Sequence, residues 1–381
     1  MSNDKKSKLI RLSKSCLSES EKRAVIRVLD HEFLGMGAEV KEFEDRLSDY
    51  FQRPAVCVVN GTAALHLAVQ ACQIGPGDEV LVPSLTYVAS YQAISATGAC
   101  PVSCEVDPED CLLDLSDAAR RISSKTKAVM PVHYSGGVGN LEAVYKFAEQ
   151  HGLRVIEDAA HAFGTVHKGK RIGSYGDIVC FSFDGIKNIT SGEGGCVVTS
   201  DEAILTRIRD ARLLGVEKDS DKRFAGQRSW EFDVGAQGWR YHMSNIMAAI
   251  GIEQLKRFPE FSTKRKELAK LYDSLLKNAK RIKTLNRDYD SVVPHIYPIR
   301  IGDLPDREAL RKRLLDYGIQ TGLHYQPNHQ LSFYASGSAP ALPVTEKIYS
   351  ELLTLPLHPD LDEEDVRYVS EMLIKELNHV G

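Results

Sequence analysis

The chain lacks the features that mark membrane, secreted and nucleic-acid-binding proteins. No uninterrupted apolar run reaches about eighteen residues, the length that a transmembrane helix requires. The opening segment MSNDKKSKLIRLSKS has no apolar core of the kind found in signal peptides. Lys and Arg form no dense run, and a formal net charge of −4 gives no electrostatic reason to expect nucleic acid or a membrane surface as a partner. We therefore expect the protein to remain in the cytoplasm.

Cysteine is present, but not in the arrangement of a metal site or a disulfide scaffold. Eight cysteines are spread over 381 residues, and the closest group, Cys100, Cys104 and Cys111, does not have the C-x-x-C spacing of a zinc site. Three others lie in apolar runs typical of strands and are expected to be small buried hydrophobic residues: Cys57, Cys180 and Cys196. The sequence thus predicts neither a metal ion nor a disulfide.

What the chain does have is an alternation of short apolar runs with helical patterns over its first half. Helices are predicted at Thr62–Cys72 and Leu141–His151, the second ending at a Gly152 C-cap. This βαβ rhythm predicts an α/β fold of three layers, with a mainly parallel sheet covered by helices on both faces. The predicted strands are Val56–Val59, Glu79–Pro83, Val102–Val106, Ala128–Val132, Arg154–Asp158, Ile178–Phe183 and Gly195–Thr199.

The pattern changes after about residue 255, which indicates a second, smaller domain. A charged helical stretch at Pro259–Lys283 is followed by a strand around Val292–Ile301, a helix at Arg307–Tyr317 and a closing helix from Glu363. We therefore predict a large domain over residues 1–255 and an α+β domain over residues 256–381. The large domain should open with a helix, since Ser18 and Glu21 have the spacing of a capping box.

Two segments point to a cofactor site. RVIEDAAHAFG is an apolar run that ends on Asp158, and DIVCFSFDGIKNITSGEGG places Ser182 and a lone Lys187 among glycines. An acid at the carboxyl end of a strand lies where open α/β sheets bind ligands, and a lysine on a neighbouring turn can reach the same crevice. A carboxylate for a pyridinium nitrogen and an amine for an aldehyde are the two protein groups that pyridoxal 5′-phosphate (PLP) needs.

A third segment, NGTAALHLA, supplies what a phosphate needs. The apolar run before it feeds a Gly-Thr-Ala turn that opens a helix, so that unpaired amides and the positive end of the helix dipole face the edge of the sheet. Taken singly, Asp158 and Lys187 have commoner explanations, because strand-end acids usually cap turns and loop lysines are usually solvated. The three segments together favour the cofactor site.

The order of these segments resembles the DegT/DnrJ/EryC1/StrS family of PLP-dependent sugar aminotransferases, which have the aspartate aminotransferase fold (fold type I). The resemblance covers almost the whole chain and is specific for family and fold, although much less so for the substrate. The phrases that carry it are LGMGAEVKEFE, NGTAALHLA, GPGDEVLVPSLTYVAS, KTKAVMPVHYSG, VIEDAAHAFG, GSYGDIVCFSF and KNITSGEGGCVVT.

The resemblance implies a role for each motif residue. Lys187 would bind the cofactor covalently and shuttle the substrate proton, and Asp158 would keep the pyridine nitrogen protonated. Tyr87 would stack on the ring; without the family pattern, a buried aromatic would be the simpler interpretation. His161 would lie near the phenolic oxygen, although a lone His on such a turn is more often a core or helix-start residue. The phosphate would be held by Thr62, Ala63 and Ser182.

The chain departs from the common family pattern at two points. Where relatives often carry an Asn that reaches a phosphate across the dimer, this chain has Arg240, whose planar fork suits a phosphate at least as well. The alternative is that Arg240 forms an ion pair within its own subunit. Asp184 follows the Ser-Phe pair where relatives often carry another residue, and it bears on substrate choice. The segment GLHYQPNH resembles the substrate-facing loop, with His324, Tyr325 and His329 as sugar contacts or, equally, as surface polar residues.

The expected activity is therefore the transfer of an amino group from an L-amino acid to a sugar carbonyl by a homodimer with shared active sites. In this family glutamate is the usual donor, a nucleotide-linked keto-deoxysugar the usual acceptor, and cell-surface polysaccharide or lipopolysaccharide biosynthesis the setting; a sugar acid such as a keto-octulosonate stays open. Dehydratase relatives replace the lysine with His, which Lys187 argues against. The alternative from another class is a non-catalytic regulatory or binding protein that keeps the fold. The sequence does not identify the sugar, the carbon aminated or the stereochemistry.

Overall fold

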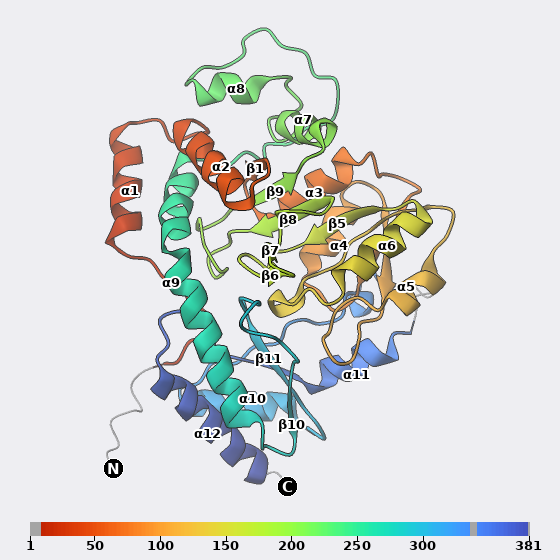
Figure 1. Cartoon of the computed structure of the whole chain (residues 1–381), viewed down its shortest axis with the longest axis vertical. Coiled ribbons are helices and arrows are strands. Elements are labelled where there is room, and N and C mark those ends of the chain that lie inside the picture. The colour runs from red at the N-terminus through yellow and green to blue at the C-terminus, as the bar shows by residue number, and fades with distance from the viewer. Residues whose placement is uncertain (1–8, 336–340, 380–381) are drawn as a thin grey trace.

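The computed structural model describes residues 9–335 and 341–379, and its centre is a sheet of seven strands (Figure 1). The strand order is β1-β9-β8-β5-β4-β2-β3, and only β9 runs antiparallel to its neighbours, so the mainly parallel sheet is confirmed. The strands are β1 (Ala55–Val58), β2 (Glu79–Pro83), β3 (Cys100–Cys104), β4 (Thr126–Val129), β5 (Arg154–Asp158), β8 (Ile178–Ser182) and β9 (Gly195–Thr199).

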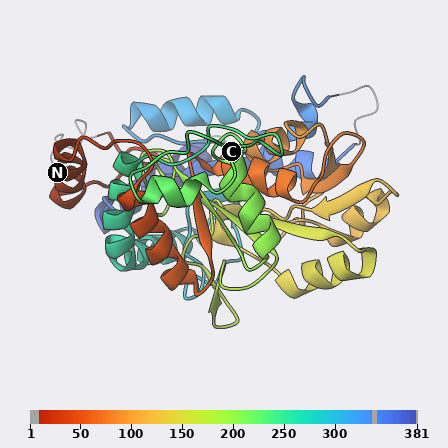
Figure 2. The same cartoon turned by 90° about the horizontal axis from the view of Figure 1, so that it is seen from above.

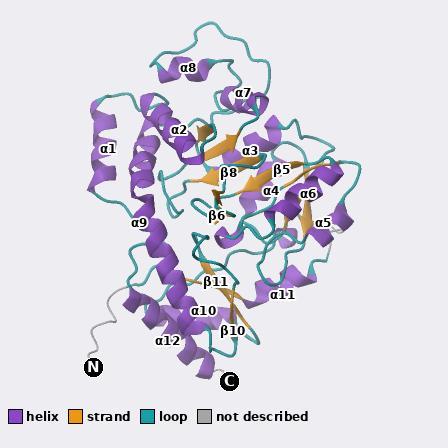
Figure 3. Ribbon diagram, in the orientation of Figure 1, coloured by secondary structure: helices purple, strands orange, loops and turns teal. Residues whose placement is uncertain are grey.

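Helices cover both faces of this sheet (Figure 3). The alternation of side chains along β8 shows why, because Val179 and Phe181 belong to one apolar core while Ile178 and Cys180 belong to the other. The first core takes in α2 (Ala38–Phe51) and α6 (Leu141–His151), and the second takes in α3 (Gly61–Ala71), α4 (Val88–Ser95) and α7 (Glu202–Ala211). The three-layer α/β architecture is therefore confirmed, and Cys57, Cys180 and Cys196 are buried in it as expected. The remaining helices and strands of this part are α5 (Leu115–Arg121), α8 (Asp219–Phe224) and the hairpin of β6 (Val166–His167) and β7 (Lys170–Arg171).

A third apolar core lies in the C-terminal part of the chain. It is built on a small antiparallel sheet of order β10-β11-β12. Its strands and helices are β10 (Ile282–Thr284), β11 (Tyr297–Ile301), α10 (Arg307–Asp316), α11 (Pro343–Glu351), β12 (Leu352–Leu355) and α12 (Glu363–His379). The strand expected at Val292–Ile301 is shorter than predicted and begins only at Tyr297.

Helix α9 (Asn245–Leu276) connects the two parts. The predicted start at Pro259 is wrong, because the helix is capped by Ser244, whose hydroxyl accepts from the Met247 amide, and it continues through the proline. The division proposed at residue 255 thus falls within a continuous helix. Its first half packs against α1 (Glu19–Asp30), which lies at the outer side of the molecule (Figure 2), and its second half against α12. Within residues 9–335 and 341–379, no helix has the length and apolar character needed to cross a membrane.

The start of the chain also links the two parts. The predicted capping box is present at α1, where Ser18 and Glu21 satisfy each other's backbone amides. Ile10, by contrast, forms a bridge with Ile319 and packs in the C-terminal core. The N-terminal segment therefore belongs to both parts of the fold.

A buried ion pair joins α2 to the edge of the central sheet. The Arg212 side chain is fully buried, and its Nη1 donates to Glu44 and to the backbone oxygen of Cys57 at 2.7 Å. Glu44 in turn accepts the Cys57 amide at 2.8 Å, and the Arg212 oxygen accepts the amide of Tyr241 at 3.0 Å. The pair thus anchors β1 and the segment that carries Arg240.

Removal of this carboxylate should destabilise the fold strongly. Glu44→Ala leaves the Arg212 guanidinium buried without its counter-charge, and we expect the free energy of unfolding to fall by about 3–5 kcal/mol. The control is Glu42→Ala on the same helix, because Glu42 pairs with Arg46 in solvent and its loss should change stability by less than about 0.5 kcal/mol. Urea unfolding at equilibrium measures both, and equal effects would contradict the prediction.

Candidate active site

A cavity of about 430 Å³ lies at the carboxyl ends of the central strands, where parallel sheets place their ligands. Eight of the predicted site residues line it: Thr62, Tyr87, Asp158, His161, Ser182, Lys187, His324 and Tyr325. These residues come from the first turn of α3, the start of α4, the ends of β5 and β8, and two loops. The fold therefore brings together segments that are more than a hundred residues apart in the chain.

Asp158 is the last residue of β5 and is only 6% exposed. Its Oδ2 accepts from the Ser90 hydroxyl at 2.7 Å, and its Oδ1 accepts from the Ala160 amide at 3.2 Å. A carboxylate has about four acceptor positions, so it can still accept a hydrogen bond from a ligand. Ser90 was not predicted from the sequence, because its contact with Asp158 depends on how α4 packs on the sheet.

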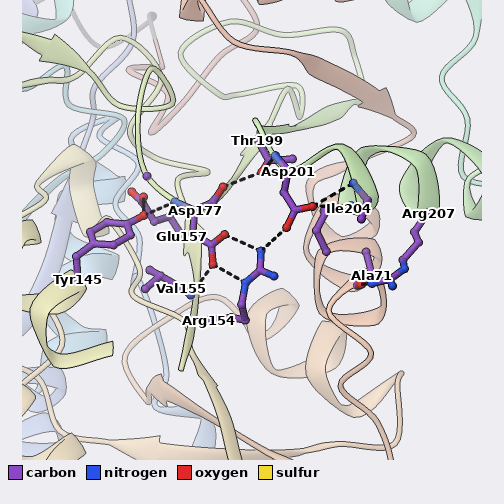
Figure 4. Close-up of polar contacts among 12 residues, drawn as sticks. Ala71, Tyr145, Arg154, Val155, Glu157, Asp177, Thr199, Asp201, Ile204 and Arg207 are labelled. Atoms are coloured by element: carbon purple, nitrogen blue, oxygen red, sulfur yellow. Dashed lines mark hydrogen bonds and ion pairs between the residues drawn. The ribbon is translucent and has the colours of Figure 1, made fainter. Parts of the chain in front are cut away.

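The opposite end of β5 is held by a polar network (Figure 4). Arg154 donates to both oxygens of Asp177, each at 2.7 Å, and to Asp201 at 3.2 Å. Tyr145 donates to Glu157 at 2.5 Å and accepts the Asp177 amide at 2.8 Å. Paired charges of this kind fix the register of β5 against β8, and with it the position of Asp158.

The first turn of α3 presents free amides to the cavity. The Asn60 side chain caps the helix by accepting the Ala63 amide at 2.8 Å. The amides of Gly61 and Thr62 have no hydrogen-bond partner among the described residues, as is usual at a helix start. A Cβ on Gly61 would lie 2.8 Å from that of Ser182, so only glycine lets the helix approach the Ser182 hydroxyl this closely. Ala63 itself is buried and lies outside the cavity lining.

Lys187 is partly buried, and its Nζ lies 3.3 Å from Nε2 of His295. Burial lowers the pKa of the Lys187 amine to about 8, against the opposing effect of the Asp158 and Asp184 carboxylates. At pH 7 to 8, a larger fraction of this amine is neutral than in an ordinary lysine. A neutral amine is the form that attacks carbonyl carbons and accepts protons. His295 was missed in the sequence because no motif surrounds it.

His161 and Tyr325 form a hydrogen-bonded pair in the cavity wall. Burial, followed by the charge of Lys187, holds the pKa of His161 well below its usual value, so the ring is neutral. The Ser135 amide donates to Nδ1 at 3.3 Å, which assigns the ring proton to Nε2. Nε2 lies 3.0 Å from the Tyr325 hydroxyl and donates to it. The Tyr325 hydroxyl therefore keeps its own proton available for a ligand.

Tyr87 and His324 stand at other points of the wall. Tyr87 is 58% exposed and lies 5.5 Å from Tyr325 between ring centroids, so the alternative of a buried packing aromatic is wrong. His324 Nδ1 lies 2.9 Å from the Thr354 hydroxyl of β12. Burial, followed by the charge of Lys187, lowers the pKa of His324 to about 4, so this ring is neutral as well.

Besides Ala63, two of the predicted residues lie outside this cavity. His329 is 6% exposed, with Nδ1 at 2.8 Å from the Ser84 hydroxyl and Nε2 at 3.1 Å from Glu346. Both ring nitrogens are thus used in packing the loop against β2 and α11, which corrects the expected sugar contact. Arg240 is exposed, and its side chain makes no ion pair or hydrogen bond within residues 9–335 or 341–379. The alternative, an ion pair of Arg240 within its own subunit, is therefore absent from this part of the chain.

The chemistry of the donor set fits PLP. An amine of lowered pKa suits the aldehyde, and a strand-end carboxylate with unused acceptor positions suits the pyridine nitrogen. Free amides at the start of α3, next to the Ser182 hydroxyl, suit a phosphate.

Comparison with known proteins agrees with this chemistry. The sequence model of the DegT/DnrJ/EryC1/StrS aminotransferase family matches residues 15–374. The chain is 36% identical over 371 residues to GDP-perosamine synthase of Escherichia coli O157:H7, covering 96% of this chain and 98% of the relative. It is 34% identical over 377 residues to dTDP-4-dehydro-2,3,6-trideoxy-D-glucose 4-aminotransferase of Saccharopolyspora spinosa, covering 97% of each.

A solved structure has the same fold. The PLP form of a putative sugar aminotransferase from Streptococcus pneumoniae superimposes with a TM-score of 0.91 at 29% identity, covering 98% of this chain and 100% of the other. Two findings agree with the chemistry of the cavity: the family model matches residues 15–374, and two relatives are more than 30% identical to this chain. The chain belongs to the DegT/DnrJ/EryC1/StrS aminotransferase family and is a PLP-dependent aminotransferase.

Proposed function

We propose that the protein transfers an amino group from L-glutamate to a keto or aldehyde carbon of a nucleotide-linked keto-deoxysugar. The observation that carries the proposal is Lys187, a partly buried amine whose pKa is lowered to about 8, in a cavity shared with a strand-end carboxylate and free helix amides. Relatives named as a dTDP-sugar aminotransferase and as GDP-perosamine synthase support a nucleotide-linked acceptor. The aminated sugar would serve cell-surface polysaccharide or lipopolysaccharide biosynthesis, by a cytoplasmic homodimer.

The cofactor phosphate would bind at the start of α3. The Gly61 and Thr62 amides and the Ser182 hydroxyl would donate hydrogen bonds to it, and the helix dipole favours its negative charge. The Ala63 side chain is buried in the core, and its amide donates to the Asn60 side chain that caps the helix. The positions of these groups are fixed by the sheet and by the close contact of Gly61 with Ser182.

The ring of the cofactor would lie between Asp158 and the aromatic residues at the cavity wall. When bound, PLP supplies an electron sink for the carbon that loses a proton. Asp158 would hold a proton on the pyridine nitrogen, Tyr87 would lie against the ring, and His161 would lie near the phenolic oxygen. Ser90 and the Ala160 amide orient the Asp158 carboxylate for this contact.

Lys187 would act as both the covalent anchor and the proton carrier. Its Nζ would hold the cofactor through the aldehyde and, as a free amine, would carry the proton lost from the amino-acid α-carbon. A pKa of about 8 suits this work, because the amine gains and loses a proton readily near neutral pH. His324 and Tyr325 would hydrogen-bond the hydroxyls of the sugar, since both line the cavity and Tyr325 has a free proton to donate.

The lysine assignment predicts a loss of activity with the fold intact. Wild-type protein should be yellow, lose that colour when glutamate is added, and retain the cofactor on the peptide containing Lys187 after borohydride reduction. Lys187→Ala should do none of these and should keep its circular dichroism spectrum. A pale wild-type protein that does not respond to amino acids would favour the non-catalytic binding protein, and labelling of another lysine would overturn the assignment.

The carboxylate assignment predicts a slow enzyme that still binds PLP in part. Asp158→Asn leaves the pyridine nitrogen without a counter-charge, so the half-reaction with glutamate should slow by at least about a hundredfold. Asp184→Asn is the control, since it removes a second carboxylate of the same cavity that does not lie at the end of β5, and its loss of rate should be much smaller. Turnover of Asp158→Asn near the wild-type rate would refute the role.

The exposed Arg240 predicts a site shared between two copies of the chain. We propose that Arg240 of one subunit completes the phosphate site of the other, so Arg240→Ala should weaken PLP binding about ten- to a hundredfold. In a mixed dimer of Lys187→Ala and Arg240→Ala chains, the site that keeps its lysine receives the intact arginine. PLP binding should return at that site. Confirmed heterodimers that bind no better than Arg240→Ala alone would rule the shared site out.

A further inference from the structure

His295 lies directly against the amine of Lys187, although no motif in the sequence marks it. It stands on the segment before β11 and is 3% exposed, with Nε2 at 3.3 Å from the Lys187 Nζ. Its ring also lies 4.5 Å from that of His161 between centroids. His295 therefore reaches Lys187 from the C-terminal part of the chain.

The surroundings of His295 keep its ring neutral. The pKa of His295 is held well below its usual value, first by burial and second by the charge of Lys187. Smaller effects in the same direction come from His161, Arg265 and His324. A neutral imidazole has one acceptor nitrogen, and the amine of Lys187 is the donor that faces Nε2. This assigns the ring proton to Nδ1, which is buried and has no partner among the described residues.

Arg265 on α9 fixes the backbone of this segment. It is 1% exposed, and its Nη1 donates to the backbone oxygens of Pro294 at 3.4 Å, His295 at 3.0 Å and Leu357 at 3.3 Å. No carboxylate in the described part of the chain forms an ion pair with it. The guanidinium thus holds the position of His295 and disfavours a second positive charge on its ring.

We infer that His295 is a positioning residue for Lys187, whose neutral ring accepts a hydrogen bond from Nζ, orients the amine in the cavity and stabilises its protonated form. The inference rests on the proposed role of Lys187. The other charged groups that act on this amine are Asp158 and Asp184, which raise its pKa, and Arg265, which lowers it. His161 and His324 remain neutral beside it and do not titrate in the same range.

A titration of the PLP-free protein tests this without any catalysis. Reductive methylation with ¹³C-formaldehyde labels the lysines, and the signal that is absent from Lys187→Arg identifies Lys187 in the NMR spectrum. In His295→Phe, which keeps the ring size but has no acceptor, the pKa of Lys187 should fall by about one to two units. In His295→Gln, which keeps an acceptor, it should stay within about half a unit of wild type. The exposed Lys41 is the internal control and should not move.

The holoenzyme supplies a second measurement. In single turnovers with glutamate, His295→Phe should lower the limiting rate constant about ten- to a hundredfold, with little change in the glutamate concentration that gives half of that rate. The acid limb of the pH profile of this rate should move to lower pH, together with the pKa of Lys187. If the Phe variant does not fold, His295→Asn, which is too short to reach Nζ, takes its place in both experiments.

The outcomes separate this inference from the proposed function. An unchanged Lys187 pKa in His295→Phe, with borohydride still labelling Lys187, would overturn the positioning role alone. Labelling of a different lysine would instead overturn the role of Lys187 and the inference with it. A lowered pKa in the Phe variant, preserved in the Gln variant, would support the hydrogen bond as the cause.

Discussion

The site depends on keeping the amine of Lys187 out of water without leaving it uncompensated. Desolvation disfavours the charged amine and lowers its pKa to about 8, while the carboxylates of Asp158 and Asp184 act in the opposite direction. An isolated buried charge is strongly destabilising, so the two carboxylates favour the protonated amine that burial disfavours. One carboxylate is fixed by the sheet, one lies on the lysine loop itself, and His295 approaches from the C-terminal part of the chain. Three separate parts of the fold therefore converge on one nitrogen atom.

The alternation of side chains along β5 explains why one acid is available to a ligand and its neighbour is not. Glu157 points to the opposite face from Asp158, where His133 at 2.7 Å and Tyr145 occupy its oxygens. A slip of one residue in the pairing of β5 would exchange the two carboxylates, since side chains alternate along a strand. The bidentate contact of Arg154 with Asp177 opposes such a slip, because it joins β5 to the residue just before β8. The register of β5 in the sheet therefore determines that Asp158, and not Glu157, faces the cavity.

The strands of the large sheet could be predicted because turn residues bound each apolar run. Glu79–Pro83, Arg154–Asp158 and Gly195–Thr199 have the predicted limits. The errors have local causes. A proline normally lies in the first turn of a helix, so the pattern misplaced the start of α9, whose tertiary contacts tolerate Pro259 in its interior. Strand β12 was missed because Leu352 follows α11 with no turn residue between them.

The sequence located residues that line the cavity where one short segment carries both the residue and its setting, as for Asp158, Ser182 and Lys187. It failed for His295, because its partner lies more than a hundred residues away and only the folded chain brings the two together. The cavity also has two walls that come from different parts of the chain. One wall is built on the edge of the large sheet, whereas His324 is held by Thr354 of the second sheet. The second sheet has its own apolar core, but the segment before β11 also carries His295, so the C-terminal part of the chain supplies a contact to the lysine amine as well as a residue of the cavity wall.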